Sequence, residues 1–256
     1  MPIIRELPNK PLVEALLEIR WKLTEQYGDP HYPVFVGALY ERVKSQYPFH
    51  EALPASVIPQ PAIPYVAQHR FRAAEGDWPP IQVGAGLVTL NDTNKYTWQD
   101  FGQRAKELML HIFEAYPEPK QLELDLLILR YIDAVGFDYQ HKDILEFLRD
   151  KLKTEVRLPH SLFENAPVQP LPQNLNFQIA FSVSSPEGVI TIRFRTGERS
   201  EESALIWETI LQSPGHSIQE VPSNFPQWIE SAHALIDDWF FKLIEGELER
   251  KFAGEE

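Results

Sequence analysis

The longest apolar run of the chain, residues 121–139 (QLELDLLILRYIDAVGFDY), lies near its middle and predicts the central strand of a sheet. From Leu126 onward its large apolar side chains fall on both alternating faces, so both faces require burial, as in the middle of a sheet. Arg130 and Asp133 interrupt this run near its end. The other strands must therefore flank this one, and the sheet must accommodate two charged groups close to its centre.

The size and composition of the chain limit its fold and its compartment. With 256 residues, 43% of them hydrophobic, it can form a substantial core in one large domain or two small ones. It has no cysteine, which excludes disulfides and thiolate zinc sites and suits a reducing cytoplasm. Its start lacks a secretory signal, and charges interrupt its apolar stretches. We therefore expect a cytoplasmic protein that does not enter a membrane.

The order strand, helix, three strands, helix is predicted twice along the chain. In the first half these elements are expected at residues 11–23, 33–46, 65–73, 78–84, 87–91 and 97–116. In the second half they are expected at residues 121–139, 143–152, 175–183, 189–196, 204–211 and 224–248. Two Pro-rich segments, 48–64 and 159–172, predict irregular connections, and the charged residues 198–202 predict a mobile loop.

A short sequence match supports an internal duplication. Residues 16–21 (LLEIRW) and 126–131 (LLILRY) share the pattern L-L-x-[IL]-R-[WY]. We therefore predict an α+β fold in which two repeats, residues 1–120 and 121–256, form one long, mostly antiparallel, twisted sheet covered on one face by helices. This topology resembles the duplicated saddle of TATA-box-binding proteins.

Two segments resemble the hallmarks of a known family. They are residues 7–14 (LPNKPLVE), followed by Glu18-Ile19-Arg20, and residues 129–133 (LRYID). Both are similar to motifs of a sporadically distributed family of bacterial and archaeal proteins without an established function, and the resemblance spans essentially the whole chain. Asp133 stands where that family favours asparagine. Its patchy distribution implies an accessory or defence-associated gene, and it supplies no catalytic residues.

Local signatures of catalysis and cofactor binding are missing from the sequence. The eight histidines show neither H-x-H nor H-E-x-x-H spacing, and no G-x-S-x-G, phosphate-binding or dinucleotide-binding glycine motif occurs. Pairs of carboxylates do occur, at 14 and 18, at 123 and 125, and at 237 and 238. Such pairs could serve general acid–base chemistry if desolvated, but they are more typical of solvated faces. We therefore expect no metal and no cofactor.

The charge of the chain argues against nucleic acid as a partner. Its formal net charge is −13, so phosphate contact is repulsive overall. The richest basic pairs are Arg70 with Arg72 and Arg193 with Arg195. They are more typical of solvated strand faces, and a nucleic-acid-binding saddle that uses them is kept only as an alternative.

Arg130 is the most informative single residue, because a charge after four consecutive apolar residues requires either an ion pair or a ligand. Its counterpart in the first repeat is Arg20. The sequence favours a non-enzymatic interaction or regulatory protein that acts through a protein partner and self-associates. The alternative is a small-ligand sensor or enzyme with a groove at the junction of the repeats, near Arg20, Arg130 and Asp133.

Overall fold

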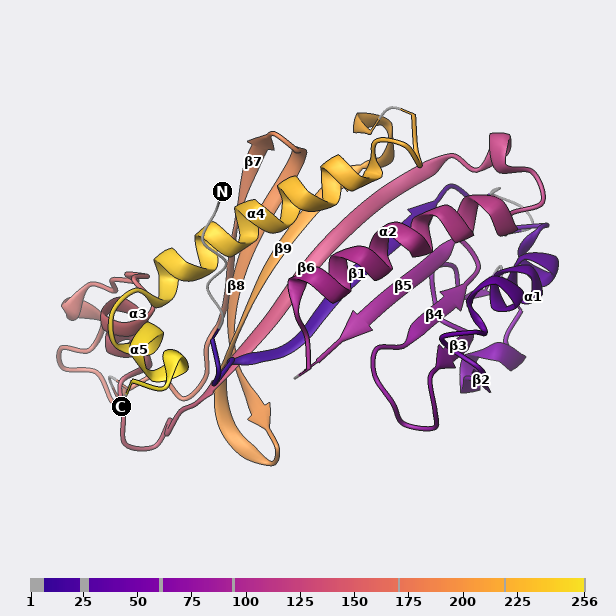
Figure 1. Ribbon diagram of the computed structural model, residues 1–256. Helices are drawn as coiled ribbons and strands as arrows, with labels where there is room; N and C mark the ends of the chain where they lie inside the picture. The colour runs from indigo at the N-terminus through magenta and orange to yellow at the C-terminus, as the bar shows by residue number, and fades with distance from the viewer. Residues whose placement is uncertain are drawn as a thin grey trace.

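The computed structural model describes residues 7–23, 28–59, 62–93, 95–169, 171–218 and 220–255. Nine strands form one antiparallel sheet in the order β2-β3-β4-β5-β1-β6-β9-β8-β7 (Figure 1). The strands are β1 (Leu12–Trp21), β2 (Phe49–Ala52), β3 (His69–Arg72), β4 (Ile81–Gly84), β5 (Leu87–Asp92), β6 (Leu124–Gly136), β7 (Asn176–Ser184), β8 (Glu187–Arg199) and β9 (Glu202–Pro214). The predicted α+β class and antiparallel sheet are confirmed.

The central pair, β1 and β6, has a reciprocal register. Leu16 lies opposite Arg130, and Arg20 lies opposite Leu126. Equivalent positions of the two L-L-x-[IL]-R-[WY] segments thus exchange places across the pair, as a twofold axis between the strands requires. Outside this pair, β1 is followed by β5 and β4, and β6 is followed by β9 and β8. The two halves therefore repeat the same arrangement, as the sequence predicted.

All five α-helices of the described chain pack on one face of this sheet. They are α1 (Tyr32–Val43), α2 (Trp98–Ala115), α3 (Ile144–Lys151), α4 (Phe225–Ile244) and α5 (Glu247–Ala253). The two long helices, α2 and α4, run across the middle of the sheet (Figure 1). The helix start predicted at Thr97 is confirmed, because its hydroxyl accepts a hydrogen bond from the backbone N–H of Asp100. None of the helices has the length and apolar character that a membrane span requires.

Strict alternation along the strands separates the core from the helix-free face. In β1, Leu17, Ile19 and Trp21 are buried beneath the helices, whereas Glu18 and Arg20 are partly exposed on the other side. Burial of each large apolar side chain contributes about 1.5–3 kcal/mol relative to exposure. The helix-covered face therefore holds most of the apolar core.

Three local predictions were wrong. The Pro-rich segment 48–64 contains the short edge strand β2, which pairs with β3. Residues 198–202 do not form a mobile loop, because β8 and β9 remain paired to Arg199 opposite Glu202, leaving only two residues in the turn. The last helix does not continue to residue 248. Gly246 has a φ of 102°, which L side chains rarely adopt, and it separates α4 from α5.

Candidate functional site

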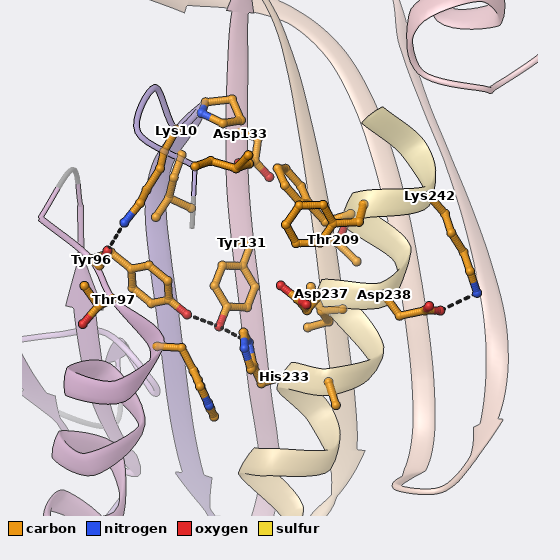
Figure 2. A pocket seen from close by; sticks show the side chains of 18 of the residues that line it. Lys10, Tyr96, Thr97, Tyr131, Asp133, Thr209, His233, Asp237, Asp238 and Lys242 are labelled. Atoms are coloured by element: carbon orange, nitrogen blue, oxygen red, sulfur yellow. Dashed lines mark hydrogen bonds and ion pairs between the residues drawn. The ribbon is translucent and has the colours of Figure 1, made fainter. Parts of the chain in front are cut away.

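A cavity of about 850 Å³ lies on the helix-covered side of the sheet, at the junction of the two halves. Its walls come from the segment before β1, the start of α2, the strands β6 and β9, and the helix α4 (Figure 2). Its volume is within the range of small-molecule sites, which span roughly 300–1,000 Å³. The alternative hypothesis from the sequence, a small-ligand sensor or enzyme, places its ligand groove at this junction.

A chain of hydrogen bonds crosses one wall of this cavity. The hydroxyl groups of Tyr96 and Tyr131 are 2.7 Å apart, and the Tyr131 hydroxyl is 3.0 Å from Nδ1 of His233 (Figure 2). The indole ring of Trp98 stacks on the His233 imidazole with ring centroids 3.7 Å apart. Burial lowers the pKa of His233 to about 4 and raises the pKa of both tyrosines. All three groups are therefore neutral near pH 7.

Asp133 lines the same cavity from β6, and its carboxyl group points into it (Figure 2). Only 3% of the residue is exposed. Its carboxyl group forms no hydrogen bond or ion pair with any residue that the structure describes. Burial raises the pKa of Asp133 to about 8, and only the charge of Arg199 opposes this rise. Near pH 7 the side chain is thus a largely protonated acid.

An unpartnered buried carboxyl group is an unusual feature. The Asp133 oxygen atoms are not among the fully buried atoms of the described residues that lack a hydrogen-bond partner, so they keep contact with the open volume of the cavity. Asp133 is surrounded by an apolar strand and faces an open volume rather than a protein partner. This combination points to a group outside the chain as its partner.

The structure does not bring the three predicted ligand residues together. Arg130 projects from the helix-free face, where its guanidinium is 2.5 Å from the carboxylate of Glu208. Arg20 lies on that face as well and pairs with Glu18. Asp133 is three positions after Arg130, and an odd separation in a strand places two side chains on opposite faces. Of the three, only Asp133 lines the cavity.

The four arginines of the nucleic-acid alternative share the helix-free face with Arg20 and Arg130. The strand register places Arg70 and Arg72 at one end of the sheet and Arg193 and Arg195 at the other. Carboxylates lie among them: Arg70 is 3.3 Å from Glu51, and Arg195 is 3.1 Å from the buried Glu208. The face therefore carries mixed charge and is not a continuous basic surface of the kind that phosphates favour.

Most residues of the cavity could not be predicted from the sequence. Tyr96 and His233 lie in different halves of the chain, and no local pattern links them. Asp133 did carry a signal, because a lone acid in an apolar strand requires an explanation. Asp237 and Asp238 were expected on the solvated side of the last helix, and both are exposed there while also lining the cavity; Asp238 pairs with Lys242 at 2.6 Å. No group of three metal-binding side chains is found among the described residues.

Comparison with known proteins does not assign the chain to a family. No family model matches the chain, and no curated protein matches it. Among solved structures, the di-domain ARO/CYC StfQ from the steffimycin biosynthetic pathway is 9% identical, with a TM-score of 0.22 and coverage of 73% of this chain and 74% of that chain. The di-domain ARO/CYC BexL from the BE-7585A biosynthetic pathway is 11% identical, with a TM-score of 0.23 and coverage of 91% and 99%. Superpositions at these scores support no inference about function.

Proposed function

We propose that this protein binds a small molecule in the cavity between its two halves and acts as a ligand-dependent sensor or regulator. The observation that carries this proposal is Asp133, a buried carboxyl group that points into the cavity without a partner in the described chain. The neutral chain of Tyr96, Tyr131 and His233 supplies further hydrogen-bonding groups to the same cavity. A mostly apolar cavity with a few convergent polar groups is the usual form of a ligand site. The absence of cysteine supports a site of action in the cytoplasm.

Blocking the cavity is expected to abolish ligand-induced stabilisation. Ala234 lines the cavity from α4, and an Ala234→Trp substitution would fill part of its volume. Because a ligand that binds only the folded state stabilises it by mass action, wild-type protein should show Tm increases with some compounds of a diverse small-molecule library. Ala234→Trp should lose these increases.

Gln227→Trp is the matched control for this screen. It places the same side chain on the exposed surface of α4, outside the cavity lining. This variant should respond to the library as the wild type does. Equal Tm increases in wild type and Ala234→Trp would place the ligand elsewhere and reject the proposed site.

A second proposal, self-association, rests on the edge strand β7. Its nine residues carry no charge, in a chain of which 24% of residues are charged, and they contain no proline. Ile179 and Phe181 on this strand are 45% and 48% exposed. Long, uncharged, apolar edges pair readily with another strand. In antiparallel pairing of two copies around Ala180, each Ile179 would face a Phe181, so the strand is complementary to itself.

A lysine on this edge is expected to prevent dimer formation. We expect the wild type to dimerise with a Kd of about 10–100 μM, because one strand pair buries less area than a standard interface. Ile179→Lys should be monomeric at concentrations where the wild type is half dimeric in sedimentation equilibrium. Val57→Lys is the control and should dimerise normally, because Val57 is 85% exposed and lies between β2 and β3, at the end of the sheet opposite β7. A monomeric wild type at about 1 mM would refute this proposal.

A further inference from the structure

We propose that the ligand of the cavity is an organic cation, whose protonated nitrogen pairs with Asp133 and whose apolar body lies against the aromatic side chains of the walls. This inference rests on the proposed function and names the chemical class of its ligand. It starts from Asp133, a buried residue of the cavity lining whose carboxyl group has no described hydrogen-bond or ion-pair partner. When ionised, this group carries a charge opposite to that of a protonated amine.

The other charges of the lining favour the same class of ligand. Among the described residues, six carboxyl side chains and two lysines line the cavity. One lysine, Lys10, donates a hydrogen bond to the backbone carbonyl of Tyr96, and the other, Lys242, pairs with Asp238. Both cations therefore already have acceptors. Glu230 also pairs with Lys106, and with both lysines engaged no described cation of the lining remains to receive an anion.

The aromatic side chains of the lining suit the body of such a ligand. The lining includes Tyr96, Trp98 and Tyr131 together with Phe240 and Phe241 of α4. Aromatic faces attract cations as well as apolar groups, and the attraction is stronger where water is excluded. An amine bound in the cavity could therefore contact both the aromatic rings and the Asp133 carboxylate.

Binding of a cation would release a proton from the protein. Asp133 is protonated near pH 7 because burial raises its pKa to about 8, and it must ionise to pair with an ammonium group. The charged and titratable groups that face it are Arg199 from β8, Lys10 from the segment before β1, Tyr131 from β6, and Asp237 and His233 from α4. The pKa of His233 is lowered to about 4, so His233 stays neutral between pH 6 and pH 9. Affinity should therefore rise with pH up to about 8 and then level off.

Three indole compounds of the same shape test this inference. Tryptamine carries a cation, tryptophol is its neutral counterpart, and indole-3-propionate is an anion. Isothermal titration calorimetry at pH 7, in two buffers of different ionisation enthalpy, should show tryptamine binding with release of about one proton. Tryptophol and indole-3-propionate should bind at least tenfold more weakly. Between pH 6 and pH 9 the affinity for tryptamine should rise roughly 50-fold or more.

Two variants show whether Asp133 is responsible. Asp133→Asn keeps the size of the side chain but cannot ionise, and it should lose at least tenfold in affinity for tryptamine and all of the pH dependence. Asp125→Asn changes an exposed acid on the same strand and should behave as the wild type does. Equal or tighter binding of the neutral or anionic compound, or tryptamine affinity that ignores pH or Asp133→Asn, would overturn the cationic class. The absence of tryptamine binding would also overturn the cationic class. If other compounds raise the Tm and Ala234→Trp abolishes those increases, the proposed ligand site itself is still supported.

Discussion

Asp133→Asn is expected to increase the free energy of unfolding at pH 7, by up to about 4 kcal/mol. The pKa of Asp133 is raised from 3.8 to about 8 by burial. Between these two values the unfolded chain loses the proton and the folded protein keeps it. Wild-type stability therefore falls by about 1.4 kcal/mol for each pH unit from about pH 4 to about pH 8, and levels off above that. Asparagine has no charge to bury and removes this loss.

Urea unfolding at pH 5, 7 and 9 measures the effect. The stability advantage of Asp133→Asn over the wild type should be small at pH 5 and largest at pH 9. Asp125→Asn, which changes an exposed acid near the start of the same strand, should follow the wild-type profile at all three values. A variant that is less stable than the wild type at pH 7, or one whose profile runs parallel to that of the wild type, would show that Asp133 is not a neutral, unpartnered acid.

Loss of both arginines around Glu208 is expected to cost much more than the two separate losses combined. Glu208 is 1% exposed, and its two carboxylate oxygens lie 2.5 Å from Arg130 and 3.1 Å from Arg195. After one substitution to alanine the other arginine still neutralises the buried carboxylate, so each single variant should cost about 1 kcal/mol. The double variant removes both guanidinium groups that contact the buried carboxylate, which should cost about 3–5 kcal/mol.

A double-mutant cycle on urea unfolding measures this coupling. Arg130→Ala combined with Arg70→Ala is the control, because Arg70 pairs with Glu51 instead of Glu208. The control pair should be additive within about 0.5 kcal/mol. Additive losses for Arg130 and Arg195 as well would mean that Glu208 is not held by both guanidinium groups.

The centre of the fold was predictable because its signals are local. Residues 126–131 are apolar on both faces, which required a position inside the sheet, and their match to residues 16–21 indicated the repeat. In the structure these two segments pair with each other. The edge strand β2 was missed because its four residues lie in a segment whose prolines dominate the local pattern. The edge strand was therefore missed because it is short and because prolines surround it.

The candidate site was only partly predictable, because its residues meet through tertiary packing. From the sequence we predicted a ligand groove at the junction of the repeats that includes Asp133, but we placed Arg130 in the same groove. The odd separation of these two residues already implied opposite faces of the strand. The contact between Tyr131 and His233 joins positions 102 residues apart and depends on where α4 crosses the sheet. No spacing within the sequence encodes that crossing.

Native mass spectrometry of the protein purified from its own host tests the central claim most directly. We expect the folded wild-type chain, of 29.6 kDa, to carry a small molecule that is released on denaturation. Ala234→Trp, prepared in the same way, should carry none, and Gln227→Trp should carry the same mass as the wild type. A wild-type protein without any bound molecule, or a molecule retained equally by Ala234→Trp, would contradict the assignment of the cavity as the functional site.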